Sequence, residues 1–232
     1  MPLHRKKGNP LGDKVMIIFD LDGTLHRTES ALVPAIQRAM ADLGHPPAEP
    51  EEINALYGEP LEVFCSRLLG RGGSTCSAFR EGIRRHQQTT LRESGALYPG
   101  IAAMLEELGR MGLSLSICSN AGLDYIRLVT SCLGIEGFFD MLMGVEDGRP
   151  KSERVRDMIS SSGSDFAVMV GDRYHDIRAA RENGIPSIGC LYGYGSEKEM
   201  EAADHAVEDP SAIPSVVARI LAERGLTPIP SP

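Results

Sequence analysis

Residues 15–24 read Val-Met-Ile-Ile-Phe-Asp-Leu-Asp-Gly-Thr. The first five are apolar throughout, without alternation, which is typical of a strand buried on both faces of its sheet. Asp20 and Asp22 follow at once, and Asp22-Gly23 is a strong turn signal. Two carboxylates this close repel each other unless a cation or a proton intervenes. Oxygen ligands held together on a turn suit Mg²⁺, so the end of this strand is a candidate magnesium site.

The same two carboxylates are suited to phosphoryl transfer. Asp20 can attack phosphorus and carry the group as an acyl phosphate. Asp22, pointing elsewhere, can give a proton to the leaving oxygen and later take one from water. An ordinary turn contains the same residue types, since Asp and Gly are common there. Taken alone, this stretch leaves both interpretations open.

The composition is that of a soluble globular protein, with 232 residues of which 42% are hydrophobic and 24% charged. The formal net charge of −8 provides no basic surface, so no nucleic-acid partner is expected. No stretch approaches the length of a membrane span, so no membrane partner is expected either. The five cysteines are scattered without a C-x-x-C pair, and Cys118 and Cys190 lie in apolar runs. This usage predicts buried, reduced thiols and a cytoplasmic location.

After the first strand, residues from about 28 to 97 are predicted to be almost wholly helical. Apolar residues recur at helical spacing over 32–43, over 61–69 after Pro60, and over 77–91. No strand candidate appears in this region of the sequence. It is therefore predicted to be a separate helical unit.

From residue 98 onward, helical patterns alternate with short apolar runs. The predicted strands are 113–118, 141–143, 166–170 and 187–191. The predicted helices are 101–111, 123–133, 152–161 and 177–183. Such alternation predicts an α/β fold, with a parallel sheet covered by helices on both faces. The core would be discontinuous, residues 1–26 and 98–232, with a helical cap of residues 27–97 inserted into it.

Polar side chains follow three of the predicted strands, at the edge of the sheet where ligands bind in open parallel sheets. Asp20 follows the first of these strands. Ser119 and Asn120 follow the strand over 113–118; they can donate to phosphate oxygens, or simply form a turn. Asp172 follows the strand over 166–170 and can complete a Mg²⁺ shell or cap the next helix. Asp176 comes four residues later and is expected to act through the water shell or a cation.

Lysine is scarce, and one lysine stands out by its position. The chain has five, at positions 6, 7, 14, 151 and 198. Lys151 alone lies between the first strand and the final region, in a predicted loop after Arg149-Pro150. A compact ammonium there can bind phosphate and hold Asp20 ionised. A solvated lysine at a helix start is the alternative.

These motifs, in this order, resemble those of the haloacid dehalogenase-like superfamily, in the branch of phosphoglycolate phosphatases with an α-helical cap. The motifs are Asp20 to Thr24, Ser119-Asn120, Lys151, and Gly171-Asp172 with Asp176. The resemblance implies a Rossmann-like three-layer core with Asp20 as nucleophile and Asp22 as acid/base. It also implies Ser119, Asn120 and Lys151 as phosphate binders, and Mg²⁺ held by Asp20, the Asp22 carbonyl and Asp172, with Asp176 behind them.

The resemblance implies hydrolysis of a small phosphorylated metabolite, with phosphoglycolate as the first candidate. A 5'-nucleotidase or a sugar phosphomutase is the alternative within the superfamily, and a non-catalytic ligand-sensing module is the alternative outside enzymes. A dehalogenase would not need Asp22, and the phosphonate hydrolases of this branch need a cap lysine, which residues 27–97 lack. Arg80, Arg84 and Arg85 are expected to form a solvated face, unless one reaches the substrate. We expect a monomer or weak homodimer.

Overall fold

The computed structural model describes residues 14–57, 61–70, 74–145 and 148–227. Its strands are β1 (Val15–Phe19), β2 (Ser114–Cys118), β3 (Met141–Met143), β4 (Phe166–Gly171), β5 (Ser187–Cys190) and β6 (His205–Val207). Its helices are α1 (Glu29–Asp42), α2 (Pro50–Asn54), α3 (Leu61–Leu69), α4 (Ser74–Ser94), α5 (Ile101–Arg110), α6 (Leu123–Cys132), α7 (Lys151–Ser162), α8 (Tyr174–Asn183), α9 (Glu197–Met200) and α10 (Ile213–Arg224). Two short 3₁₀ turns are Glu136–Phe138 and Pro210–Ala212.

The strands form one parallel sheet in the order β3-β2-β1-β4-β5-β6. β1 lies in the middle, paired with β2 on one side and β4 on the other, and all five of its residues are buried. The unbroken apolar run of β1 is explained by this place, because both faces of a parallel sheet are covered. The α/β fold with a Rossmann-like parallel sheet is confirmed.

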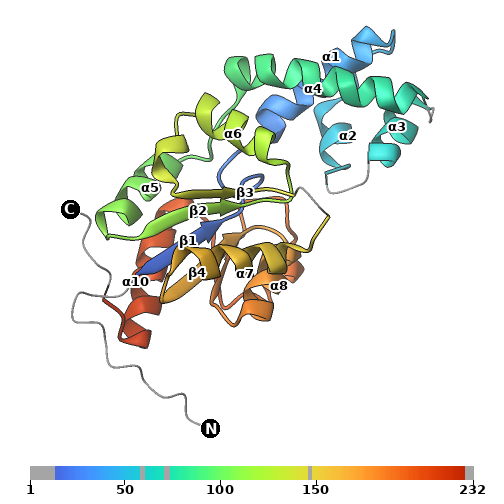
Figure 1. Ribbon diagram of the computed structural model, residues 1–232. Helices are drawn as coiled ribbons and strands as arrows, with labels where there is room; N and C mark the ends of the chain where they lie inside the picture. Colours follow the sequence, from blue (N-terminus) through green and yellow to red (C-terminus); the bar gives the residue numbers. More distant parts are fainter. Residues whose placement is uncertain (1–13, 58–60, 71–73, 146–147, 228–232) are drawn as a thin grey trace.

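Helices cover both faces of the sheet (Figure 1). Ile17 and Phe19 of β1 pack on one face with buried side chains of α5, α6 and α10. Met16 and Ile18 pack on the other face with side chains of α7 and α8. The alternation of side chains along β1 therefore joins two hydrophobic cores into a three-layer structure.

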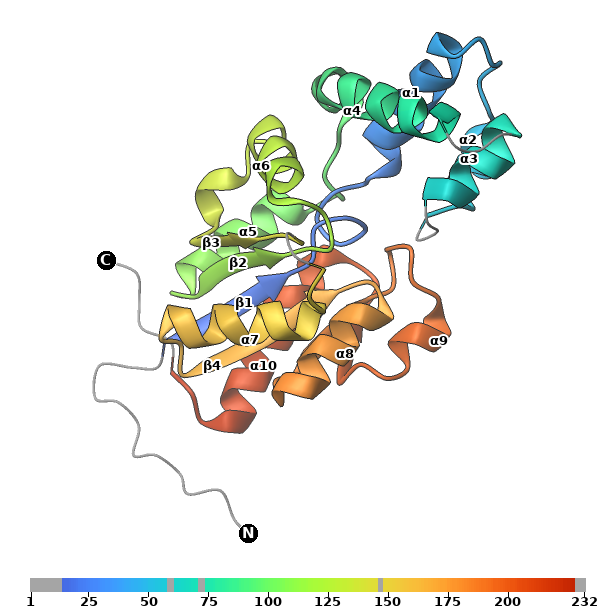
Figure 2. The ribbon, with the colours of Figure 1, turned by 45° about the vertical axis from the view of Figure 1, so that its right-hand side comes forward.

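The helices α1 to α4 stand apart from the sheet, beyond its carboxyl edge (Figure 2). We call them the helical insertion. They have a hydrophobic core of their own, in which Ile36, Ile53 and Phe79 are almost fully buried. The two connections to the rest of the chain run side by side, joined by an isolated antiparallel bridge between His26 and Leu97. The domain boundaries at 26/27 and 97/98 stay a prediction.

The strands that were predicted agree with the structure to within about one residue, but the helices α7 and α8 begin earlier than predicted, and α9 and α10 were not predicted. Lys151 is the first residue of α7, not part of a loop, because extended Pro150 serves as its N-cap and accepts from the backbone N–H of Glu153. Helix α8 begins at Tyr174, three residues before the predicted start. The sixth strand, His205–Val207, was not predicted. Pro60, which was expected to precede a helix, lies outside the described residues.

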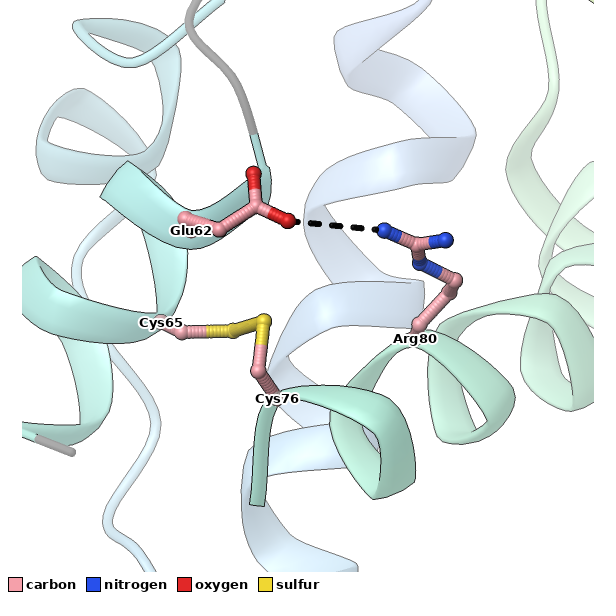
Figure 3. The surroundings of a disulfide bond; sticks show 4 residues. All are labelled: Glu62, Cys65, Cys76 and Arg80. Carbon is pink, nitrogen blue, oxygen red and sulfur yellow. Dashed lines mark ion pairs between the residues drawn. A yellow bond between two sulfur atoms is a disulfide. The ribbon is translucent and has the colours of Figure 1, made fainter. Parts of the chain in front are cut away.

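Cys65 of α3 and Cys76 of α4 form a disulfide (Figure 3). Their Cα atoms lie 5.5 Å apart, within the range that a disulfide spans. Glu62 and Arg80, from the same two helices, form an ion pair of 3.7 Å beside it. This pairing corrects the expectation of reduced thiols, which holds for buried Cys118 and Cys190. Sequence spacing cannot reveal that two helices bring these cysteines together.

Among the described residues, none of the helices combines the length and apolar character that crossing a bilayer requires.

Candidate active site

The central strands end at a common edge, and the predicted site residues meet there. Asp20 follows β1, and its backbone N–H donates to the carbonyl of Val170 in β4 at 2.8 Å. Ser119 follows β2, and its backbone N–H donates to the carbonyl of Met143 in β3 at 3.0 Å. The backbone pairing of the four neighbouring strands β3, β2, β1 and β4 thus fixes where these side chains start.

Three carboxylates gather at this edge. Asp20, Asp172 and Asp176 each offer an oxygen, and these oxygens lie within 4.8 Å of one another. Asp172 and Asp176 are almost completely buried, and Asp20 is only 7% exposed. Asp176 was expected to act through the water shell or a cation, and its Oδ1 lies 2.5 Å from the ammonium of Lys151; its role stays a prediction. Such a set of hard oxygen ligands suits a small divalent cation.

Asp172 is held in place by two donors from different parts of the chain. The Thr24 hydroxyl donates to its Oδ1 at 3.1 Å, and the backbone N–H of Tyr194 donates to its Oδ2 at 2.8 Å. Gly23 passes close by with φ of +80°, and a Cβ there would lie 2.3 Å from Asp172 Oδ2. Only glycine therefore allows the turn after β1 to lie against this carboxylate.

Lys151 joins two of the carboxylates. Its Nζ lies 2.5 Å from Asp20 Oδ1 and 2.5 Å from Asp176 Oδ1. Burial alone would lower the pKa of Lys151, but Asp176 and Asp20 outweigh it and raise this pKa, so the ammonium stays charged. The backbone N–H of Arg173, at the start of α8, holds the other oxygen of Asp176 at 3.0 Å.

The carboxylate cluster carries more negative charge than Lys151 can balance. Burial, with Asp176 and Asp172 nearby, raises the pKa of Asp20 well above its ordinary value despite Lys151. Burial and Asp176 likewise raise the pKa of Asp172 to about 6. A divalent cation would favour the ionised forms of both groups. The electrostatics and the ligand geometry therefore both fit a divalent metal site.

Asp22 has a different environment from Asp20. Its Oδ1 accepts from the Thr28 hydroxyl at 2.7 Å and from the Tyr125 hydroxyl at 2.9 Å, and it lies 3.3 Å from Nδ1 of His26. Burial alone would raise the pKa of Asp22, but the hydrogen bonds from His26, Thr28 and Tyr125 outweigh it and lower this pKa. Asp22 is thus an anchored carboxylate, two residues from Asp20 yet outside its cluster.

Ser119 and Asn120 lie beside the cluster, in the same cleft. The Ser119 hydroxyl oxygen accepts from the backbone N–H of Ala121 at 3.1 Å, which leaves its proton for a further partner. Arg154 of α7 donates to the Ser119 carbonyl and, at 2.5 Å, to Asn120 Oδ1. Ser119 and Asn120 were predicted to meet Lys151, Asp20 and Asp22 at one site, and all five line the same cleft. The roles of these residues stay predictions.

The cleft has a volume of about 560 Å³ and lies between the sheet edge and the helical insertion. Tyr57 of the insertion lines it together with Tyr194, which follows β5; the ring centroids are 5.1 Å apart. Arg80, Arg84 and Arg85 do not line the cleft. Each of them pairs with an acidic side chain on the outside of the insertion. The solvated-face interpretation of these arginines is confirmed.

Sequence reasoning missed four residues that shape the site: Thr28, Tyr125, Arg154 and Tyr194. None belongs to a motif with a chemical signature. A Tyr near a predicted helix start, or an Arg one turn after Lys151, resembles many surface residues until the chain folds. The one available signal was the position of Arg154, three residues after the lysine, on the same side of a helix.

Comparison with known proteins identifies the family of this chain. The model of the haloacid dehalogenase-like hydrolase family matches residues 17–190. A phosphoglycolate phosphatase of Photorhabdus laumondii is 27% identical, over 90% of this chain and 92% of the relative. A 5'-nucleotidase of Pseudomonas aeruginosa is 31% identical, over 80% of this chain and 86% of the relative.

A solved structure shares the whole fold. A haloacid dehalogenase-like hydrolase from Streptococcus pneumoniae superposes with a TM-score of 0.74 at 24% identity, covering 89% of this chain and 98% of that one. The family match spans the first strand, the helical insertion and the sheet up to β5. The chain is therefore an enzyme of the haloacid dehalogenase-like hydrolase family and resembles its phosphoglycolate phosphatases in sequence.

Proposed function

We propose that this protein is a Mg²⁺-dependent phosphomonoester hydrolase that acts through an aspartyl-phosphate intermediate. One observation carries the proposal: Asp20 lies in a buried cluster with Lys151, Asp172 and Asp176, while Asp22 is anchored separately. A nucleophile must be ionised, and Lys151 together with a bound cation favours the ionised form of Asp20, whereas Asp22 lies outside this cluster.

In the proposed reaction, Asp20 attacks the phosphorus atom, and the bond from phosphorus to the leaving oxygen breaks. Asp22 in its protonated form gives a proton to that oxygen, so the alcohol leaves neutral. Asp22, now a carboxylate, takes a proton from water as the water oxygen attacks phosphorus. The bond to Asp20 then breaks, which releases phosphate and restores the nucleophile.

Other side chains hold the phosphoryl group. The Ser119 hydroxyl, the Asn120 amide and the Lys151 ammonium donate to its oxygens, which gain charge in the transition state. Asp20, Asp172 and the Asp22 carbonyl would hold a Mg²⁺ ion, with Asp176 behind them. That ion would neutralise negative charge on the phosphoryl group. Asp176 belongs to the same carboxylate cluster as Asp20 and Asp172, which also supports a role for it as a direct metal ligand.

Phosphoglycolate is the first proposed substrate, because several relatives bear the name phosphoglycolate phosphatase. A nucleoside monophosphate is the second, because Tyr57 and Tyr194 offer ring surfaces for a base in a cleft of about 560 Å³. We further propose a cytoplasmic protein, monomeric or weakly dimeric, that closes its helical insertion over the substrate.

The test is hydrolysis of an aryl phosphate with Mg²⁺, with and without a chelator, followed by a panel of phosphorylated metabolites. We expect chelator-sensitive turnover that Asp20→Asn reduces by about 10⁴-fold or more. Turnover by Asp20→Asn close to that of the wild type would contradict the covalent mechanism. No turnover of any ester would favour a ligand-sensing module, and conversion of β-glucose 1-phosphate to the 6-phosphate would favour a mutase.

A further inference from the structure

The largest fully buried side chain among the described residues is charged. Arg154, on the second turn of α7, is only 2% exposed. None of the ion pairs between described residues involves it, whereas Lys151, one turn earlier, pairs with two carboxylates. An unpaired buried charge is costly, and well-packed apolar residues commonly replace buried ionic groups without loss of stability. Stability alone gives no reason for an arginine at this position.

The contacts of Arg154 point to the candidate phosphate-binding loop. Its Nη1 donates to the Ser119 carbonyl and lies 4.0 Å from Cys118 Sγ, and its Nη2 donates to Asn120 Oδ1 at 2.5 Å. Its Nε has no hydrogen-bond partner among the described residues. Both of its hydrogen bonds to oxygen therefore end on two consecutive residues that follow β2, and its contact with sulfur is to the last residue of β2.

These bonds decide which atoms the loop presents to the cleft. Because Asn120 Oδ1 accepts from Arg154, the amide nitrogen of Asn120 is left to donate into the cleft that this residue lines. If the amide turned over, it would present an oxygen to an anion. The tie to the Ser119 carbonyl fixes the backbone that carries the Ser119 hydroxyl.

The positive charge of Arg154 also helps to balance the negative charge of a bound phosphoryl group. Asp20, Asp172, Asp176 and Lys151 together have a formal charge of −2, which a divalent cation only neutralises. A phosphoryl dianion needs more positive charge than these groups leave. Arg154, buried behind the loop and not balanced by an ion pair, supplies it in a medium of low dielectric constant.

We propose that Arg154 is a positioning residue for the phosphoryl group: it orients Ser119 and Asn120 as donors and provides the buried positive charge behind them. This inference rests on the proposed function, since it assigns Arg154 to the same site. Arg154 does not line the cleft and acts through the loop.

The test is calorimetric binding of inorganic phosphate, in the presence of Mg²⁺, to the wild type and to Arg154→Met. Methionine keeps most of the length but removes the charge and the donors. We expect the Kd for phosphate to rise about 10- to 100-fold, as for loss of hydrogen bonds from a charged group. KM and the inhibition constant of phosphate should rise with it. Arg156→Met, an exposed arginine on the same helix, is the matched control and should stay within about twofold.

Folding is checked by thermal unfolding of each variant. A folded Arg154→Met that binds phosphate as tightly as the wild type would overturn the proposal, as would an equal loss in Arg156→Met. If Arg154→Met does not fold, Arg154→Lys decides: it keeps the charge but cannot hold both loop residues, so a rise of about three- to tenfold in Kd is expected. An unchanged Kd in Arg154→Lys would then overturn the proposal.

Phosphate binding needs no turnover, so this test is separate from that of the proposed function. A wild type that binds phosphate but hydrolyses no ester would contradict the hydrolase proposal and leave the assignment of Arg154 to be decided by its own variants. A wild type that hydrolyses esters while Arg154→Met keeps its affinity would contradict only the assignment of Arg154.

Discussion

The sheet edge and the helical insertion place their charged residues in opposite ways. At the sheet edge, Asp20, Lys151, Asp172 and Asp176 are almost completely buried and contact one another. In the insertion, the arginine pairs lie on the outside; the Arg84–Glu81 pair, for example, is largely exposed. Buried charges interact strongly, whereas exposed pairs contribute little. We therefore expect the chemistry at the sheet edge, while the insertion lines one wall of the cleft.

Replacing Lys151 tests the sheet-edge side of this comparison and should have the largest effect after that of Asp20→Asn. Lys151→Ala should lower kcat by about 10²- to 10³-fold, as for removal of one fixed transition-state donor. Loss of the ammonium also raises the pKa of Asp20 further, since a positive neighbour favours the ionised carboxylate. The acid limb of the pH–rate profile should then move to higher pH.

Steady-state kinetics across a pH series measure both effects. Lys198→Ala, at an exposed position in α9, is the control and should leave the profile unchanged. A Lys151→Ala enzyme with a kcat near that of the wild type would show that the buried charge cluster is not the catalytic centre.

Tyr125 tests whether Asp22 depends on its anchor. Tyr125→Phe removes one of the donors that fix Asp22 Oδ1 in place, so Asp22 should be less well positioned to protonate the leaving oxygen. We expect a loss of about tenfold for alkyl phosphates, whose leaving group needs a proton, and a smaller loss for p-nitrophenyl phosphate. A plot of rate against leaving-group pKa measures this. Equal losses for both substrates would contradict an acid/base role for Asp22.

Replacing Tyr57 tests how much the helical insertion contributes to substrate binding as a wall of the cleft. Tyr57→Leu should raise KM about two- to tenfold for substrates with a ring, as expected from loss of one aromatic contact, with little change in kcat. Tyr57→Phe is the control, because it keeps the ring and removes only a buried hydroxyl that has no hydrogen-bond partner among the described residues. A loss in kcat with KM unchanged would instead place Tyr57 in the chemistry.

The disulfide gives the smallest expected effect on activity. Replacing both Cys65 and Cys76 by serine should lower the free energy of unfolding by about 2 to 3 kcal/mol, as for a short closed loop. Turnover should stay within about twofold, because neither residue lines the cleft. Denaturant unfolding with and without a reductant measures the change. A thiol titration that finds five free thiols in the native protein would contradict the pairing.

The sequence predicts some strands of the sheet better than others, for a physical reason. Val15–Phe19 and Met141–Met143 are short apolar runs with turn signals after them, so local pattern alone predicts β1 and β3. β6 has three residues, one of them His205, and no such pattern. It is a strand because β5 provides an edge with which it can pair.

Much of the site follows the same rule. Asp20, Ser119 and Asp172 follow strands, so topology brings them together, and this was predictable. Arg154 and Tyr125 contact the site from helices, at sequence separations of 34 and 103 residues from their partners. The Cys65–Cys76 pair depends in the same way on how α3 meets α4. Contacts between elements depend on packing, which no local pattern records.

The central claim is that Asp20 becomes covalently phosphorylated during turnover. Its most direct test is rapid acid quenching of the wild type during steady-state hydrolysis, followed by borohydride reduction and peptide mass spectrometry. The account predicts that an acyl phosphate is trapped at Asp20, seen as conversion of this residue to homoserine, and that no such product forms without substrate. An unmodified Asp20 during active turnover, or trapping at Asp22 or Asp172 instead, would contradict it.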